Sequence, residues 1–319
     1  MKKVAIGIDI GGTNTVLGIV DRDGNLLSDI SMPTQTKETI EEYVSDLVQK
    51  INSLIKSSKD KIEIVGIGIG APNGNYHKGT IEHAANLRWK GIIPFVNLVK
   101  KHYNVPVALT NDANAAAIGE MIYGAAKGMK DFVVITLGTG LGSGLVVNGE
   151  LVYGHDGFAG EIGHTLVYPD GRQCGCSKKG CLETYVSATG MVRTMSEILC
   201  NSNKPSSLRD IPYNQLTSLS IQKALEAGDE LAKECFEYTG KILGMKLADT
   251  VAHTSPEAIF LFGGMAKAGD LLIKPTIKSM EENLLPIFRN KVKILLSGLL
   301  DVNAAILGAG ALIWNEIEK

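Results

Sequence analysis

A glycine-rich turn that joins two strands is the feature that most constrains the fold of this chain. The segment VAIGIDIGGTNTVLGIVDRDGNLL, from Val4 to Leu27, contains an apolar run, the turn Gly11-Gly12-Thr13, and a second run from Thr15 to Val20. Glycine turns that bind phosphate usually lie between a strand and a helix. The second run is β-branched and apolar, so it predicts a strand. The turn is therefore predicted to form a hairpin that offers bare backbone N–H groups.

The same pattern occurs again in the segment DFVVITLGTGLGSGLVVNGELV, which begins at Asp131. An apolar strand leads into the turn Gly138-Thr139-Gly140, a second strand follows from Gly144 to Val147, and Asn148-Gly149 turns into a third. Two copies of this pattern predict a duplicated architecture with a cleft between its halves. Hairpins on both sides of a cleft are suited to hold the two ends of a triphosphate.

A third glycine turn ends the buried-looking strand AIFLFGGMA, at Gly263-Gly264. Each turn alone is explained by a tight hairpin that needs positive φ, but three in one chain favour a nucleotide site. The chain has no G-x-x-x-x-G-K-[ST] loop. The glycines from Gly66 to Gly70 are followed by Pro72-Asn73-Gly74 rather than by a helix, which argues against a dinucleotide fold. The prediction is an α/β, actin-like ATPase fold of the sugar-kinase type.

Composition narrows the class of protein further. The 319 residues are 45% hydrophobic with a net charge of -2, so we expect a large core in two lobes and neither nucleic acid nor membrane as a partner. Lys2 and Lys3 precede an apolar run that Asp9 interrupts, which argues against a signal peptide. A cytoplasmic location is therefore predicted. With five cysteines, three of them close together, metal binding is favoured over a disulfide framework.

The clustered cysteines predict a zinc site. Cys174, Cys176 and Cys181 lie in RQCGCSKKGCLE, and His164 precedes them by a short loop. Three thiolates and one imidazole would close a tetrahedral structural zinc site with no position left for water. The alternative is four unrelated residues in a glycine-rich loop.

Two aspartates stand at the ends of predicted strands. Asp112 follows the strand Val105 to Thr110 and precedes a helix predicted from Ala113 to Ala126. It could cap that helix, which position alone favours, or take a proton as a general base. Asp9 ends the first strand, where it could cap the turn or hold Mg²⁺ through water.

Five segments carry a family resemblance: GIDIGGTN, LTNDANAAAIGE, LGTGLGSG, GEIGH and CGCSKKGCLE occur in this order along the chain. The sequence resembles the ROK family (repressors, open reading frames, kinases), and within it the bacterial ATP-dependent glucokinases. The resemblance implies an enzyme that uses ATP and Mg²⁺ to phosphorylate a hexose, with glucose expected first. It also implies a homodimer. Ser177 replaces a glycine that is usual in the cysteine motif.

The resemblance also implies roles for particular residues. Asp112 would be the catalytic base. The residues expected to bind the sugar are Asn86, Asn111, Glu161, His164 and Glu183. Those expected to bind nucleotide or its metal are Asp9, Gly11, Gly12, Thr13, Asn14, Gly138, Thr139, Gly140, Gly263 and Gly264. The zinc ligands would be His164, Cys174, Cys176 and Cys181.

Alternatives of the same class are kinases for N-acetylglucosamine, N-acetylmannosamine or fructose. A sugar-responsive transcription regulator of the same family would need a DNA-reading domain, and the chain begins at the phosphate strand without a basic patch. A bare actin-like ATPase would not need the zinc and glutamate positions. We expect a first lobe of residues 1–120 plus about 303–319, including a helix from Lys37 to Lys56, and a second lobe of about 121–302.

Overall fold

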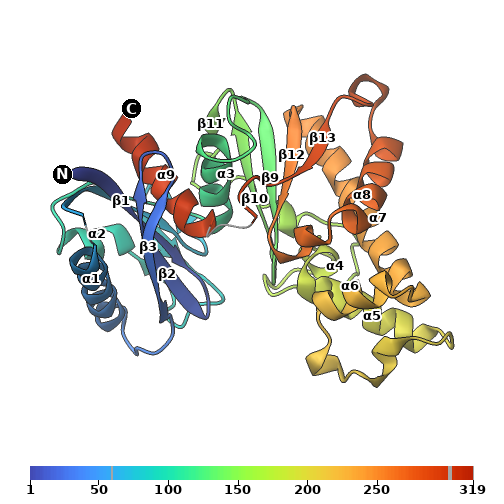
Figure 1. Cartoon of the computed structure of the whole chain (residues 1–319). Helices are drawn as coiled ribbons and strands as arrows, with labels where there is room; N and C mark the ends of the chain where they lie inside the picture. Colours follow the sequence, from blue (N-terminus) through green and yellow to red (C-terminus); the bar gives the residue numbers. More distant parts are fainter. Residues whose placement is uncertain (59, 301–303, 319) are drawn as a thin grey trace. The chain divides into compact units, whose positions relative to one another are not determined.

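The computed structural model describes residues 1–58, 60–300 and 304–318, and it divides into two compact units (Figure 1). Unit 1 comprises Met1–Met129, Gly144–Gly160 and Ser297–Lys319, and unit 2 comprises Lys130–Ser143 and Glu161–Leu296. The chain thus passes from one unit to the other at four points. The lobe limits expected from the sequence stay predictions, and Asn303, where the last helix was predicted to begin, lies outside the described residues.

Unit 1 is built on a five-stranded sheet with the order β3-β2-β1-β4-β8. Its strands are β1 Lys2–Ile10, β2 Asn14–Asp21, β3 Leu26–Pro33, β4 Ile62–Gly70 and β8 Val107–Thr110. Strands β1 and β2 pair antiparallel, so the first glycine turn does join two strands as predicted. Strands β1, β4 and β8 run parallel, which brings their carboxyl ends to one edge of the sheet.

Helices α1 (Ile40–Ser57) and α9 (Ala304–Glu318) cover this sheet. The apolar side chains of α1, among them Tyr43, Leu47 and Ile51, are fully buried in one core with those of β1 and β4. Helix α9 packs directly on the backbone of β1 and β4, where a Cβ at Gly7 would overlap the carbonyl of Ile306 and a Cβ at Gly68 that of Ala309. Glycines are therefore required at both positions.

Two helices differ in length from their sequence predictions. Helix α1 begins three residues after Lys37, because Thr39 and Glu42 form a capping box at its start. Helix α3 spans Asp112–Ile122 and ends before the predicted Ala126. Its residue Glu120 is buried, and the carboxylate accepts hydrogen bonds from the N–H groups of Ala125 (2.7 Å) and Gly298 (2.8 Å) and from the hydroxyl of Ser297 (2.5 Å). Because the N–H of Ala125 bonds to this side chain, the segment after Ile122 does not continue the helix.

The remaining elements of unit 1 are short. Helix α2 spans Phe95–Lys100, and a three-stranded sheet consists of β5 Gly74–Asn75, β6 Thr80–Glu82 and β7 Ile92–Ile93. The absence of a helix directly after β4 agrees with rejecting a dinucleotide fingerprint there.

The second sheet has the order β11-β10-β9-β12-β13. Its strands are β9 Phe132–Leu137, β10 Leu141–Val147, β11 Glu150–Leu151, β12 Ala258–Phe262 and β13 Lys293–Leu296. The repeat of strand, glycine turn, strand, turn and strand is therefore present as predicted. Strand β12 pairs parallel with β9, so the third glycine turn follows β12 at the same edge as the end of β9.

The helices of unit 2 are α4 Glu183–Val186, α5 Ala188–Asn201, α6 Ser218–Glu226, α7 Glu230–Thr254 and α8 Asp270–Asn283. Helices α7 and α8 approach closely, since a Cβ at Gly240 would lie 2.7 Å from the ring of Pro275. Between α5 and α6 the chain forms two short 3₁₀ turns, Ser207–Asp210 and Tyr213–Gln215. Among the described residues, no helix combines the length and the apolar character needed to cross a bilayer.

The contact between α9 and β4 yields a stability prediction. Gly68→Ala should lower the free energy of unfolding by about 2 kcal/mol or more, because the added methyl overlaps backbone that has no room to move. Gly70→Ala, two residues along the same strand, should cost less, since its Cβ would have neighbours no nearer than 3.4 Å. Urea unfolding of both variants measures the difference, and equal losses would contradict the role of backbone contact.

Candidate functional site

Asp9 and Asp112 lie next to each other at the carboxyl edge of the unit 1 sheet. Asp9 pairs with Gly70 across β1 and β4, and a Cβ at Gly70 would lie 3.6 Å from both Asp9 Oδ1 and Asp112 Cα. Burial raises the pKa of Asp9 to about 7, and the negative charge of Asp112 adds to the rise. Two carboxylates in such a place are typical of a cation or phosphoryl-transfer site.

The cap of helix α3 is Asn111, not Asp112. Asn111 Oδ1 accepts a hydrogen bond from the N–H of Ala113 at 2.8 Å, and Asp112 is the first helical residue. Asp112 Oδ1 lies 2.8 Å from the same N–H, but its side chain reaches solvent. Desolvation of the carboxyl group by the surrounding protein raises the pKa of Asp112. The hydrogen bond from the Ala113 N–H lowers that pKa and offsets part of the rise. The alternative in which Asp112 caps helix α3 is therefore wrong, because the residue before it, Asn111, is the cap.

The first glycine turn contacts the loop that contains Asn86. The N–H of Gly11 donates to the carbonyl of Asn14 at 3.0 Å, and a Cβ at Gly12 would lie 3.4 Å from Asn86 Nδ2. Gln35 fixes this arrangement, because its Nε2 donates to the carbonyls of Gly12 and Asn86. Sequence reasoning missed Gln35, since an isolated glutamine carries no motif.

Two further contacts stabilise the first glycine turn and the loop of Asn86 in unit 1. The carbonyl of Thr13 accepts from the N–H of Thr34 at 2.9 Å, which fixes the exit of the turn. Trp89, in the same loop as Asn86, is buried with its ring centroid 4.6 Å from that of Tyr43. Trp89 therefore packs in the core.

In unit 2 the turn Gly138-Thr139-Gly140 is closed by its own backbone, with the N–H of Gly138 donating to the carbonyl of Gly140 at 3.0 Å. Gly263 follows β12 with a φ of 98°, and a Cβ there would lie 2.6 Å from the carbonyl of Leu137. The second and third glycine turns therefore meet at the end of β9. At Gly264 a Cβ would meet nothing within 4 Å, so that backbone is open.

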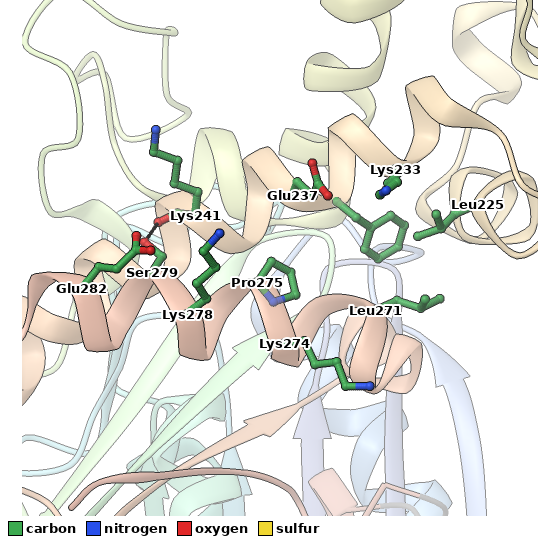
Figure 2. Close-up of a pocket in the computed structure, with 11 residues that line it drawn as sticks. Leu225, Lys233, Glu237, Lys241, Leu271, Lys274, Pro275, Lys278, Ser279 and Glu282 are labelled. Atoms are coloured by element: carbon green, nitrogen blue, oxygen red, sulfur yellow. Dashed lines mark hydrogen bonds between the residues drawn. The ribbon is translucent and has the colours of Figure 1, made fainter. Parts of the chain in front are cut away.

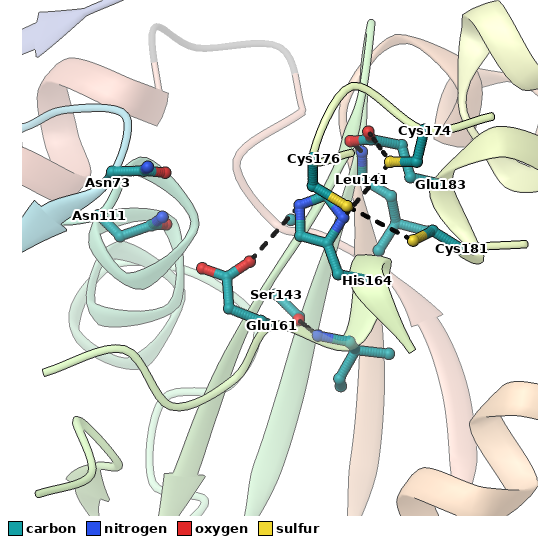
Figure 3. Close-up of polar contacts among 12 residues, drawn as sticks. Asn73, Asn111, Leu141, Ser143, Glu161, His164, Cys174, Cys176, Cys181 and Glu183 are labelled. Carbon is teal, nitrogen blue, oxygen red and sulfur yellow. Dashed lines mark hydrogen bonds and ion pairs between the residues drawn. The ribbon is translucent and has the colours of Figure 1, made fainter. Parts of the chain in front are cut away.

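The four residues predicted to bind zinc come together in unit 2 (Figure 3). The ligand atoms of His164, Cys174, Cys176 and Cys181 all lie within 4.8 Å of one another. The Sγ atoms of Cys176 and Cys181 are 3.6 Å apart, and Cys174 Sγ is 3.7 Å from His164 Nδ1. A tetrahedral zinc ion with bonds of about 2.3 Å to sulfur separates its ligands by about 3.7 Å. The donor set and its spacing therefore fit zinc, and the sulfur distance excludes a disulfide.

The two predicted sugar-binding glutamates of unit 2 lie beside this cluster. Glu161 Oε2 is 4.0 Å from His164 Nε2, the nitrogen that faces away from Cys174. Glu183 Oε2 accepts a hydrogen bond from the N–H of Leu141 at 3.0 Å, and Glu183 Oε1 lies 3.8 Å from Cys174 Sγ. Glu183 thus connects the cysteine cluster with the glycine hairpin, a contact that sequence reasoning did not foresee.

Arg172 holds the cysteine loop on the helices that follow it. Its guanidinium donates to Glu197 and to the carbonyl of Thr184 (2.7 Å), and it lies 4.5 Å above the ring of Tyr185. The sequence indicated this supporting role of Arg172 only through its position two residues before Cys174. This set of hydrogen bonds from one guanidinium supports the loop without the need for a metal ion.

A model of the ROK family matches residues 5–316 of the chain. The chain belongs to the ROK family. A glucokinase of Halalkalibacterium halodurans is 34% identical over 323 residues, with 98% of this chain and 97% of the relative covered. A xylose repressor of Caldicellulosiruptor bescii is 27% identical over 285 residues, which cover 89% of this chain and 70% of the relative.

A solved ROK family structure is similar over nearly its whole length. The glucokinase from Streptomyces griseus in complex with glucose and AMPPNP superposes with a TM-score of 0.82 and 33% identity, covering 97% of this chain and 98% of that one. The predicted α/β, actin-like fold of the sugar-kinase type is thereby confirmed.

One groove lies away from all of these residues. It occupies about 640 Å³ on helices α6, α7 and α8 (Figure 2). Its lining includes Phe236, Pro275 and four lysines, and it contains no residue that the ROK motifs single out. Lysine stems commonly cover apolar helix surface in this way.

The raised pKa of Asp9 predicts a pH-dependent stability. The folded pKa, about 7, exceeds the ordinary value of 3.8, so the cost of burying the charged form is absent below pH 4 and complete above pH 7. Asp9→Asn should therefore unfold at higher urea than the unsubstituted protein at pH 8, by about 1 kcal/mol or more, and gain little at pH 4.

Urea unfolding at both pH values without divalent cations measures this gain. Asp29→Asn, an exposed carboxylate on β3, is the matched control. A gain for Asp9→Asn that is the same at pH 4 and pH 8 would show that the charge is not its cause.

Proposed function

We propose that the protein is an ATP-dependent glucokinase that transfers the γ-phosphoryl group of ATP to the 6-hydroxyl of glucose. The observation that supports this most is the similarity, over nearly the whole chain, to a ROK glucokinase solved with glucose and AMPPNP. The paired carboxylates of Asp9 and Asp112 supply the chemistry that such a transfer needs.

Asp112 acts as the general base. Its side chain reaches solvent at the start of α3, and Asn111 rather than Asp112 caps that helix. The carboxylate takes the proton of the glucose 6-hydroxyl as its oxygen bonds to the γ-phosphorus and the bond to the ADP oxygen breaks. The raised pKa of Asp112 makes this carboxylate a better base than an ordinary aspartate.

The sugar is held by the side chains that the resemblance singled out. Asn86 and Asn111 offer amide groups, which can both donate to and accept from hydroxyls. Glu161, His164 and Glu183 offer groups fixed by the cysteine cluster, with His164 Nε2 turned away from the sulfurs. A ligand side chain whose second nitrogen is free of the metal is well suited to a hydroxyl.

The glycine turns hold the nucleotide. The N–H groups of Gly11, Gly12, Thr13 and Asn14 serve one part of the triphosphate, and those of Gly138, Thr139 and Gly140 another. Gly263 and Gly264 follow β12, and the open backbone at Gly264 lets the nucleotide approach.

Asp9 fits a role beside Mg²⁺. Its half-buried carboxylate carries a raised pKa, so a nearby cation would stabilise the charged form. When bound, Mg²⁺ neutralises phosphate charge, and Asp9 would orient the water around it.

The zinc ligands have a structural role. Three thiolates and one imidazole leave no position for a reacting water, so the cluster fixes the loop between His164 and Glu183. Homodimer formation and a cytoplasmic location stay predictions that the resemblance and the sequence support.

A panel of hexoses tests the substrate. The kcat/KM for glucose should exceed that for mannose, fructose, N-acetylglucosamine and N-acetylmannosamine in an assay coupled to ADP release. A tenfold preference for an N-acetyl sugar, about 1.4 kcal/mol of discrimination, would replace glucose as the substrate. Turnover of no sugar, together with sugar-dependent DNA binding, would favour a regulator like the xylose repressor.

Asp112→Asn tests the catalytic base. The amide keeps the shape of the side chain but cannot accept the proton, so kcat should fall at least about a hundredfold. Glucose affinity and melting temperature should change little, because Asn111 provides the cap. The matched variant Asn111→Ala removes that cap and should cost about 1 kcal/mol of stability. An Asp112→Asn enzyme that retains most of its turnover would refute the assignment.

Metal analysis tests the zinc. Protein purified without added metal should contain about one zinc per chain, and Cys176→Ala should lose zinc, glucose affinity and thermal stability together. Cys200→Ala, an exposed cysteine outside the cluster, serves as control and should lose none of them. Fully active protein without zinc would contradict the structural role.

A further inference from the structure

Glu183 contacts two functional groups of unit 2 with a single carboxylate. Its Oε2 accepts the N–H of Leu141, directly after the turn Gly138-Thr139-Gly140, and its Oε1 lies 3.8 Å from Cys174 Sγ (Figure 3). A Cβ at Gly140 would overlap Glu183 Oε2, so the carboxylate lies against the backbone of the turn itself. A negative charge therefore occupies the surface of the predicted phosphate hairpin.

The segment that begins at Glu183 is fastened to this hairpin by two further bonds. The N–H of Ala188 donates to the carbonyl of Gly138, and the hydroxyl of Thr189 donates to the carbonyl of Thr139, both at 2.9 Å. Arg172 supports the same segment through the carbonyl of Thr184. The hairpin and the end of the cysteine loop thus form one block, and of the three bonds to the hairpin only that of Glu183 carries charge.

The position of this charge matters for an anionic ligand. A phosphate bound by the hairpin needs its N–H groups, and Glu183 already takes the N–H of Leu141. A carboxylate beside the bound phosphate also repels it, and the low polarisability of a protein interior strengthens that repulsion. A nucleotide therefore binds more weakly while Glu183 keeps this contact.

We infer that Glu183 is a positioning residue that couples the sugar to the nucleotide. In the sugar-free protein its carboxylate lies on the phosphate hairpin and weakens nucleotide binding. Sugar hydroxyls that hydrogen-bond Glu183 draw the carboxylate from Leu141 and share its charge, which strengthens nucleotide binding. The inference rests on the proposed function, because it assigns Glu183 to the sugar.

The affinity for Mg-AMPPNP, measured by calorimetry without sugar, tests this coupling. Glu183→Gln keeps the size of the side chain and its hydrogen-bonding oxygen but removes the charge. It should bind Mg-AMPPNP at least about threefold more tightly than the unsubstituted protein. Glu226→Gln removes one exposed charge on α6 of the same unit and should leave the affinity unchanged.

Repeating the titration with saturating glucose measures the coupling itself. The unsubstituted protein should gain about fivefold or more in nucleotide affinity, the lower range of allosteric couplings, and Glu183→Gln should gain less than twofold. If Glu183→Gln binds Mg-AMPPNP no more tightly than the unsubstituted protein without sugar, the inference is wrong. A merely structural role predicts equal or weaker binding.

A second variant covers the case in which Glu183→Gln does not fold. Glu183→Asp keeps the charge but is one methylene too short to reach the N–H of Leu141, so a smaller gain in nucleotide affinity is expected. Unchanged or weaker binding would overturn the inference. Failure of the proposed function gives a different result: the unsubstituted protein would phosphorylate no hexose, whatever the Glu183 variants bind.

Discussion

The close contact between helix α9 and the backbone beneath it determines where the reactive groups of unit 1 lie. A helix axis normally stays 8–10 Å from its neighbour because side chains intervene. Here glycines on both sides remove the side chains: Gly7 and Gly68 face α9, and a Cβ at Gly308 of α9 would overlap the carbonyl of Ala115. One helix therefore fixes β1, β4 and α3 together. Asp9 lies one residue before the end of β1, and Asp112 begins α3.

Each unit contains groups that are costly to keep in a folded protein. Asp9 carries a carboxylate whose burial and charged neighbour oppose ionisation. The cysteine cluster holds three sulfurs within 4.8 Å of one another and of an imidazole nitrogen of His164. A bound cation would stabilise the charged form of Asp9 and the thiolates of the cysteine cluster. The packing that holds these groups in place does not need a cation. Active sites commonly carry such unfavourable electrostatics at the expense of stability.

The sequence predicted those parts of the structure that depend on local rules. Glycine turns followed by β-branched runs gave both hairpins, and closely spaced cysteines gave the cluster, because turn conformation and ligand spacing are local properties. The residues that were missed act through distant partners. Gln35 is recognised only when the loop of Asn86 lies beside Gly12, and Arg172 only when α4 and α5 fold beneath it.

Local rules also erred by one or a few residues. The helix predicted from Lys37 begins after Thr39, and the cap expected at Asp112 is Asn111, because both sites offer several residues that can cap. Hydrogen-bond geometry, not residue type, decides among them. The helix expected to reach Ala126 stops early because Glu120 bonds to Ser297 and Gly298, residues nearly two hundred positions away.

That buried carboxylate has a mechanical consequence. Two of the four points at which the chain leaves or enters unit 1 lie at 129/130 and 296/297. The Glu120 carboxylate accepts from the N–H of Ala125 before the first point, and from the Ser297 hydroxyl and the Gly298 N–H just after the second. One side chain near the end of α3 opposite to Asp112 therefore ties together the segments that lead to both points.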